Sequence, residues 1–162
     1  MSSGRRRRRS GRRLADLEIV WAVRASVAAT MAEAHRQARP TVVHQGIMRV
    51  HARWLEHTRL SIPHFEIPAS VYAIYPDLSH AQDWEQAIAA TSFVPDEVIA
   101  ELSDALGLVG TPEHCVRRIV DLTAAGVKSL YVMPLQTFVG PEQEIRTFRD
   151  AVFPRLKAAG YR

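Results

Sequence analysis

The sequence predicts an α/β protein built on a parallel β-sheet. Apolar runs at 17–28, 106–110 and 127–135 each lead into a stretch with helix signals. Near-continuous apolar runs are typical of strands that are covered on both faces, as in parallel sheets. Strands that alternate with helices in this way are joined by right-handed crossovers. The chain has 162 residues, 47% hydrophobic and 23% charged, and we expect one folded domain.

The first strand is predicted over 17–28, where LEIVWAVRASVA is rich in β-branched and aromatic residues. Thr30 and Glu33 follow as T-x-x-E, a capping box whose hydroxyl and carboxylate satisfy free N–H groups at a helix start. We therefore expect a helix from Thr30 to about Arg39. It should end there because Pro40 disfavours helical backbone at the residue before it.

The segment 40–103 is predicted to be a helical insertion that adds no central strand. Its prolines break it into short pieces, and they stand at positions 40, 63, 68, 76 and 95. Further helices are expected to start at Ser79 and after Pro95. Apolar side chains at helical spacing support these helices. They are Ile47, Val50, Trp54 and Leu55 in one group and Ala81, Trp84 and Ile88 in another.

The last sixty residues carry the clearest signals. Thr111 and Pro112 follow the run at 106–110 as an N-cap and a first-turn proline, and Gly126 can end the helix in a left-handed conformation. A strand at 127–135 and a last helix from Pro141 complete the pattern. The expected core faces are Val116, Ile119, Val120 and Thr123 in one helix and Ile145, Phe148, Val152 and Leu156 in the other.

The positive charge is concentrated at one end of the chain. The formal net charge is +4, yet residues 1–13 hold seven arginines and no acidic residue, which leaves 14 basic against 17 acidic groups elsewhere. We expect 1–13 to be a disordered tail. A nucleic-acid-binding arm is the less favoured alternative, because no aromatic residues are interleaved with the arginines.

The lengths of the apolar runs and the number of cysteines indicate where in the cell the protein is expected. No run reaches the roughly 18–20 apolar residues of a membrane helix, which predicts a soluble protein without a membrane partner. The single cysteine, Cys115, excludes an internal disulfide and fits a cytoplasmic location.

Three groups of reactive side chains are predicted to be structural. His44, His51, His57 and His64 are six or seven residues apart, unlike the i, i+4 pair of a helical zinc site, so no metal site is expected. Cys115 has no identifiable His/Asp arrangement around it and is expected to be inert. The acids of the cluster Asp77, His80, Asp83 and Glu85 are explained by a helix N-terminus, with acid/base catalysis as the alternative.

Repeated strand–helix units build either an open doubly wound sheet or a closed eight-stranded barrel, and composition does not choose between them. The sequence contains no G-x-G-x-x-G and no G-x-x-x-x-G-K-[ST]. The usual nucleotide-binding fingerprints of open sheets are therefore missing.

Three segments in order resemble the C-terminal portion of luciferase-like monooxygenases, in particular the deazaflavin-dependent methylenetetrahydromethanopterin reductases. They are LADLEIVWAVRASVA (14–28), LVGTPEHCVRRIVDLTAAGVKSLYVMPL (108–135) and EIRTFRDAVFPRL (144–156). In that family GTPE opens the helix after the seventh barrel strand and AGV leads into the eighth. The resemblance covers 14–39 and 104–158. It implies an α/β fold that is a partial (β/α)8 TIM barrel of about the last three strands.

A whole barrel typically takes about 250 residues, so the resemblance implies that 14–162 form only the C-terminal part of such a domain. The family uses a deazaflavin (coenzyme F-420) or FMN, held mostly by the first five strands. We therefore expect the chain alone to lack most of the cofactor site and to pair with the missing half-barrel or with a second copy of itself.

The active site of a parallel barrel lies at the carboxyl ends of its strands, which names candidate residues. Gly110 and Thr111 would border the cofactor, unless they serve only as a tight turn and an N-cap. The expected substrate pocket follows the last strand, and the segment 26–30 borders the same mouth. The substrate-pocket candidates are Met133, Pro134, Gln136 and Thr137.

The function implied by the resemblance is that of a fragment of a flavin- or deazaflavin-dependent oxidoreductase. The parent enzyme would be a monooxygenase or a hydride-transfer reductase acting on a small organic substrate, and we expect the fragment alone to be inactive. The alternatives are a non-catalytic protein that pairs through an exposed sheet edge, because unpaired strand edges favour association, or a basic-tailed nucleic-acid-binding protein.

Overall fold

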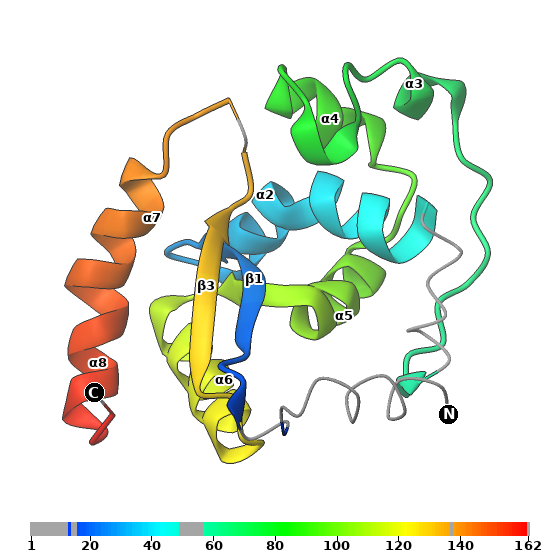
Figure 1. Ribbon diagram of the computed structural model, residues 1–162. Coiled ribbons are helices and arrows are strands. Elements are labelled where there is room, and N and C mark those ends of the chain that lie inside the picture. The colour runs from blue at the N-terminus through cyan, green and yellow to red at the C-terminus, as the bar shows by residue number, and fades with distance from the viewer. Residues whose placement is uncertain (1–12, 14–15, 49–56, 137, 162) are drawn as a thin grey trace.

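The computed structural model describes Arg13 and residues 16–48, 57–136 and 138–161. It contains one parallel sheet of three strands, β1 (Val20–Val27), β2 (Gly107–Gly110) and β3 (Ser129–Pro134), in the order β2-β1-β3 (Figure 1). The three strands fall within the three predicted runs. The predicted α/β class with a parallel sheet is confirmed.

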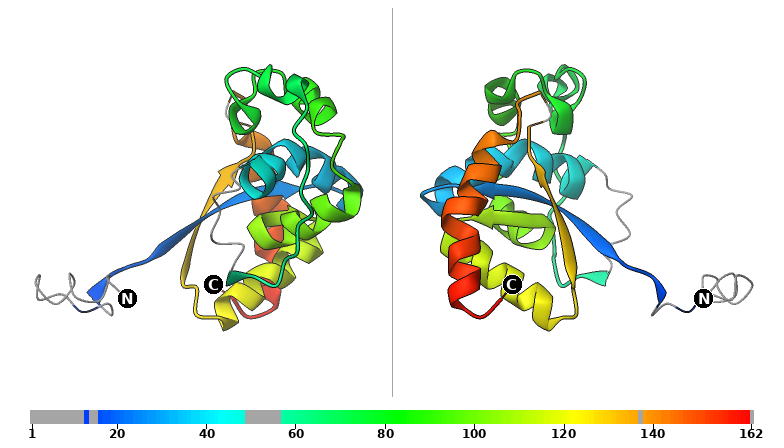
Figure 2. Two further views of the ribbon diagram at one scale, coloured as in Figure 1. Left: turned by 90° about the vertical axis from the view of Figure 1, so that its right-hand side faces the viewer. Right: turned by 60° about the vertical axis from the view of Figure 1, so that its left-hand side comes forward.

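Helices cover both faces of the sheet because side chains alternate along each strand. Val109 of β2 packs in a core with α2 (Met31–Val43) and α5 (Asp96–Leu106). Ala25, Val27 and Leu108 point the other way, into a second core with α6 (Pro112–Ala124) and α8 (Phe153–Ala158). Between β3 and α8 the chain forms α7 (Glu142–Thr147) and η6 (Phe148–Val152), and α7–α8 run beside β3 (Figures 1 and 2).

The strand order differs from that of successive barrel strands, which neighbour one another in chain order. Here β1 lies between the other two strands, and its register pairs Val27 with Gly110 and Ala22 with Tyr131. The reason is the position of α6. Its Cys115 packs on the face of the sheet to which Leu108 points, opposite α2, and the chain therefore crosses β1 before it forms β3. The described sheet thus has a doubly wound arrangement and does not show a barrel.

The predicted end of the first helix at Arg39 is wrong, because α2 continues through Pro40 to Val43. Tertiary contacts hold it in place. Arg39 donates hydrogen bonds to the carbonyl oxygens of Thr91 and Val94 at 3.1 and 2.6 Å. Burial of Val42 and Val43 adds a hydrophobic contribution that outweighs the local cost of proline. The π-helical turn η3 (His44–Met48) follows directly.

The predicted caps of the two long helices are present. Thr30 accepts a hydrogen bond from the Glu33 N–H at 3.2 Å, and Thr111 accepts one from the His114 N–H at 3.3 Å. The capping box is only half formed, since the Glu33 carboxylate pairs with Arg36. Gly126 has φ +95° after α6, as expected of a residue that ends a helix.

Between 57 and 103 the structure describes helices and loops but no strand. The helices are α3 (Ala69–Tyr72), η5 (Leu78–His80), α4 (Trp84–Ala90) and the first part of α5, which follows Pro95 as predicted. The predicted helix start at Ser79 is wrong, because Asp77 caps η5 and Asp83 caps α4. Val50, Trp54, Leu55 and His51, and the tail at 1–12, lie outside the described residues.

The first half of β1 is exposed, contrary to the expectation of a strand covered on both faces. Val20 and Trp21 are 53% and 56% exposed, whereas Ala25 is fully buried. The reason is the shortness of β2, which pairs only with Arg24–Val27 of β1. Figure 2 shows the start of β1 extending away from the helices.

The last predicted core face is partly wrong. Ile145 is 61% exposed, although Phe148 and Val152 are buried. No helix among the described residues is both long and apolar enough to cross a bilayer.

Candidate functional site

A polar pocket of about 270 Å³ lies at the carboxyl ends of β1 and β3. Its position follows from the topology: the chain goes from β1 to β2 on one side and returns to β3 on the other. In open α/β sheets ligands bind at such a point, where the loops after the two strands diverge. Its lining residues are Ser26, Val27, Ala28, Glu33, Gln37, Leu135, Gln136, Gln143, Glu144 and Thr147.

Two side chains of β1 hold the elements around this pocket in place, and of these two Ser26 lines the pocket itself. The buried Ser26 hydroxyl donates to the Ala34 carbonyl oxygen at 3.0 Å and ties β1 to α2. The Arg24 guanidinium donates to the carbonyl oxygens of Pro134 and Leu135 at 3.0 and 3.3 Å, so it holds the turn after β3. Burial lowers the pKa of Arg24. Sequence reasoning missed Arg24, although its signal was a lone cation inside the apolar run 17–28.

Glu33 and Gln37 of α2 form one wall. Gln37 Nε2 donates to Glu33 Oε1 at 3.0 Å, and Arg36 Nε donates to Glu33 Oε2 at 3.0 Å. These hydrogen bonds, first that of Arg36 and then that of Gln37, lower the pKa of Glu33. Glu33 is therefore an ionised hydrogen-bond acceptor near neutral pH and a poor proton donor.

Glu144 lies on the opposite wall, from α7, and its carboxylate has no hydrogen-bond partner among the described residues. Three amides, those of Gln37, Gln136 and Gln143, complete the polar lining. The arrangement can therefore donate and accept hydrogen bonds to a small polar molecule, with one carboxylate free to accept a proton or a hydrogen bond.

Of the predicted substrate-pocket residues, Gln136 lies in this pocket. Met133 and Pro134 are half-buried in β3, and Pro134 takes part through its carbonyl oxygen, which accepts from Arg24. Neither side chain lines the pocket. Thr137 is outside the described residues.

Gly110 and Thr111, the predicted cofactor residues, lie at the end of β2 and do not line the pocket. Gly110 has φ +152°, and a Cβ placed there would be 2.8 Å from both His114 Cδ2 and Met31 Sδ. Only glycine suits this turn. The Thr111 hydroxyl is engaged as the cap of α6. Gly110 and Thr111 therefore form a tight turn and an N-cap, and their place beside a cofactor stays a prediction.

The charges of the pocket disfavour a phosphate-bearing flavin or deazaflavin. Phosphates are bound by basic side chains and by helix N-termini with free N–H groups. The first turns of α2 and α7 do border the pocket, but each of them places a carboxylate in its lining. The charged groups that line the pocket are the carboxylates of Glu33 and Glu144, and no lysine or arginine joins them. Its volume is also below the roughly 300–1,000 Å³ usual for cofactor-sized ligands.

The acidic cluster near α4 is structural. Asp77 accepts from the N–H of Ser79 at 2.7 Å and pairs with His80, and Asp83 caps α4. Burial opposes ionisation of Asp77, but the hydrogen bonds from His80 and Ser79 lower its pKa overall. Glu85 pairs with Arg36 at 2.8 Å. Each carboxylate is used by a cap or an ion pair.

Cys115 is fully buried, and burial raises the pKa of its thiol to about 12. A protonated, inaccessible thiol is a poor nucleophile, in agreement with the prediction that it is inert. Its neighbour His114 turns toward Asp104, with 3.0 Å between Nε2 and Oδ1. Within the part of the chain that the structure describes, no three His, Cys, Asp or Glu side chains are placed to hold a metal ion.

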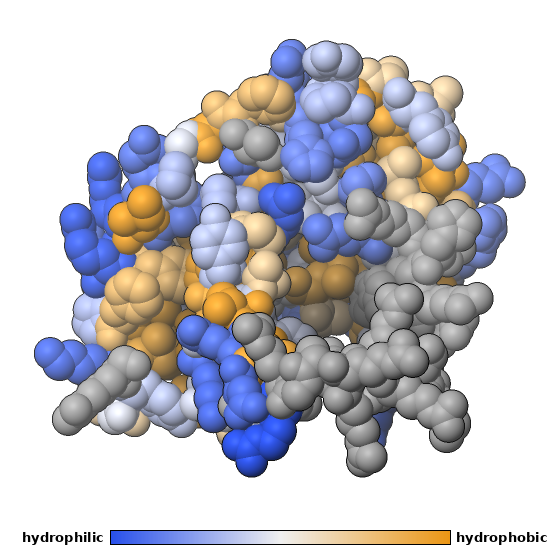
Figure 3. All heavy atoms as spheres, viewed as in Figure 1, coloured by the Kyte–Doolittle hydropathy of each residue, from blue (hydrophilic) through white to orange (hydrophobic). Residues whose placement is uncertain are grey.

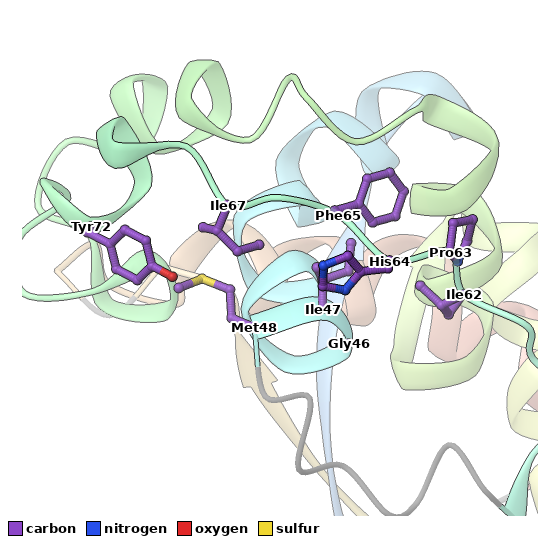
Figure 4. A pocket seen from close by; sticks show the side chains of 9 residues that line it. All are labelled: Gly46, Ile47, Met48, Ile62, Pro63, His64, Phe65, Ile67 and Tyr72. Atoms are coloured by element: carbon purple, nitrogen blue, oxygen red, sulfur yellow. The ribbon is translucent and has the colours of Figure 1, made fainter.

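A second pocket, of about 390 Å³, lies between η3 and the segment 62–72 (Figure 4). Figure 4 shows Tyr72 and Met48 toward one end and Ile62 and Pro63 toward the other. The lining is mainly apolar, and its polar side chains, His64 and Tyr72, are exposed. It offers shape but no buried reactive group.

Comparison with known proteins identifies the family. The model of the luciferase-like monooxygenase family matches residues 4–129, which include the whole of β1, β2 and α6. The match also spans the segment 40–103, so it is wider than the two stretches that carried the sequence resemblance, whereas 144–156 lies beyond it. Searches of curated proteins and of solved structures found no match. The chain belongs to the luciferase-like monooxygenase family.

Proposed function

We propose that this chain is the C-terminal portion of a luciferase-like oxidoreductase and that it contributes substrate-side contacts while the cofactor is held mainly by another part of the enzyme. The observation that carries this proposal is the polar pocket at the ends of β1 and β3, whose charged groups are carboxylates. FMN and coenzyme F-420 both bear phosphate, which those carboxylates would repel. When bound, such a cofactor supplies hydride transfer or oxygen activation.

The chain's own residues then have limited roles. The amides of Gln37, Gln136 and Gln143 would orient a small, uncharged polar substrate, and Glu144 would accept a hydrogen bond or proton from it. Arg24 would act as a positioning residue, because it fixes the turn that carries Gln136. Three further parts of the proposal depend on strands supplied from outside this chain. The complete enzyme would form a barrel. Its substrate would lie near Met133, Pro134 and Thr137, and its cofactor near Gly110 and Thr111.

Cofactor titration tests the proposal. The chain is titrated with FMN and with coenzyme F-420, and binding is followed by fluorescence. We expect the unchanged chain and its Gln136→Ala variant to give the same titration curve, because the pocket at the strand ends does not hold the cofactor. One-to-one micromolar binding that is lost in Gln136→Ala would overturn the proposal.

A second arm tests the positive part of the proposal. The DNA upstream is read for a segment encoding the first five strands, and that segment is joined to this chain. The joined protein should bind cofactor, and Gln136→Ala in it should raise KM with little change in cofactor affinity. If Gln136→Ala instead lowered the affinity for the cofactor, the substrate-side role of Gln136 would be contradicted.

The exposed start of β1 favours a second candidate function, association through a sheet edge. Val20 and Trp21 are more than half exposed, and among the described residues β1 has no partner on its β2 side before Arg24. Open apolar edges of this kind pair with other chains. Sedimentation velocity should show a dimer or larger species that Trp21→Lys dissociates. A monomer at 100 micromolar (about 2 mg/mL) would count against this function.

A further inference from the structure

A groove of about 990 Å³ lies between β3, α6 and α8, and it shares no lining residue with the pocket at the strand ends. Leu130 and Val132 of β3 line it from the sheet, Ile119 from α6, and Leu156 from α8. Figure 3 shows apolar side chains gathered on the surface between α8 and β3. The groove therefore offers a large apolar surface to a ligand.

Two aromatic rings form part of this surface. Phe148 and Phe153 pack edge to face, with ring centroids 5.8 Å apart and an interplanar angle of 64°. Phe148 is buried and holds the pair in place, whereas Phe153 is 57% exposed. A ring that is fixed on one side and open on the other favours stacking with an aromatic ligand.

The charges of the groove are of one sign. The chain has only two lysines, Lys128 and Lys157, and both line this groove. No aspartate or glutamate lines it, and neither lysine makes an ion pair with any residue that the structure describes. By contrast, arginines elsewhere, such as Arg36 and Arg155, are paired with carboxylates. Two uncompensated cations beside an apolar surface complement a negatively charged ligand.

We propose that this groove binds a planar aromatic molecule that carries a single carboxylate or sulfonate group. The ring system would lie against Phe153, Leu130 and Val132, with the anionic group toward Lys128 and Lys157. Lysine is a compact point charge that suits one small anionic group, whereas arginine suits bidentate partners. The hydroxyl group of Tyr161, which also lines the groove, can donate a further hydrogen bond to the head group, whereas that of Thr123 already donates to the Ile119 carbonyl oxygen at 2.8 Å.

The test uses 1-anilinonaphthalene-8-sulfonate and its uncharged analogue N-phenyl-1-naphthylamine, with binding to the full chain read by fluorescence. The sulfonate should bind one site per chain and more tightly than the neutral ring system. The double variant Lys128→Gln/Lys157→Gln should weaken sulfonate binding by about tenfold and leave the neutral analogue unchanged, because only the sulfonate interacts with the lysine charges. Phe153→Ala should weaken both probes.

Arg117→Gln is the matched control, because Arg117 is an exposed cation of α6 that does not line the groove. It removes one positive charge and should leave binding of both probes unchanged. Equal loss in Arg117→Gln and the lysine variants would show a nonspecific charge effect and overturn the proposal. So would binding that is not saturable or that is lost in Trp21→Ser, because either result would place the probe elsewhere.

Because the chain has only two lysines, NMR can test directly whether the probe binds beside them. Reductive methylation with ¹³C keeps the positive charge of a lysine and labels only Lys128, Lys157 and the N-terminal amine. Addition of the sulfonate should shift both lysine signals together in NMR spectra. If neither lysine signal shifts at a saturating probe concentration, the proposal is refuted, and this result holds even if the Gln variants fail to fold.

Discussion

A disulfide between β1 and β3 tests the strand order that sets the whole architecture. Ala22 and Tyr131 are paired in register, and both side chains are exposed, so cysteines can replace them without disturbing either core. Neighbouring strands are about 4.8 Å apart, which falls within the Cα–Cα range of about 4.4–6.8 Å for disulfides. If β2 instead lay between them, the separation would be about 10 Å and no bridge could form.

The expected gain in stability follows from the length of chain that the bridge closes. A loop of about 110 residues, between positions 22 and 131, corresponds to roughly 4.7 kcal/mol of lost unfolded-state entropy, and native strain reduces such gains to about 2–4 kcal/mol. The free energy of unfolding of Ala22→Cys/Tyr131→Cys should therefore be higher when oxidised than when reduced. Substitution of Cys115 by alanine in every variant removes the third thiol.

The assay combines peptide mapping by mass spectrometry with urea unfolding of the oxidised and reduced forms. The single variants Ala22→Cys and Tyr131→Cys are controls, because they can form only intermolecular bridges. Absence of a peptide that links positions 22 and 131, or equal stability of the two forms, would refute the order β2-β1-β3. It would leave the chain-order arrangement of a barrel in its place.

Three further predictions concern the interior. Gly110→Ala should lower the free energy of unfolding by about 1–3 kcal/mol in urea titrations, because the added Cβ meets His114 and Met31 at a positive φ; an unchanged midpoint would contradict this turn geometry. His35 has a pKa lowered by burial, and its Nε2 has no hydrogen-bond partner, so the folded state disfavours the charged ring. The contribution of neutral His35 to the free energy of unfolding should thus be fully present above pH 6.5 and be lost as the pH falls toward the lower pKa of the folded state. His35→Leu should make this loss of stability smaller, and an equal dependence of the free energy of unfolding on pH in both proteins would refute the prediction. Cys115 should react with a thiol reagent only when the chain opens, and fast labelling of the native protein would disprove its burial.

Several features of the fold were predictable because they depend on neighbours in the chain. Thr111 and Pro112 begin α6, Gly126 ends it, and Thr30 caps α2, since caps and turns are interactions over three or four residues. Each observed strand lies within a predicted apolar run for a similar reason. A continuous apolar stretch predicts a strand of a parallel sheet, although the exposed start of β1 shows that it does not fix which residues of the strand are covered.

The candidate site was predicted only in part. The rule that loops after parallel strands converge located Gln136 and the segment that begins at Ser26, but not their partners Glu33 and Gln37. Those partners come from elements whose neighbours depend on which side of β1 the chain returns to. The role of Arg24 as a tie to β3 likewise requires that β1 and β3 be adjacent.

The α/β class, the three strands, the caps of α2 and α6 and the resemblance to the family were all predictable from the sequence. They depend on residue types and on spacing along the chain. The central position of β1, the continuation of α2 through Pro40 and the exposure of the start of β1 became evident only from the packed structure. These outcomes depend on which surfaces meet, because packing between distant segments outweighs local preference where many apolar groups are buried together.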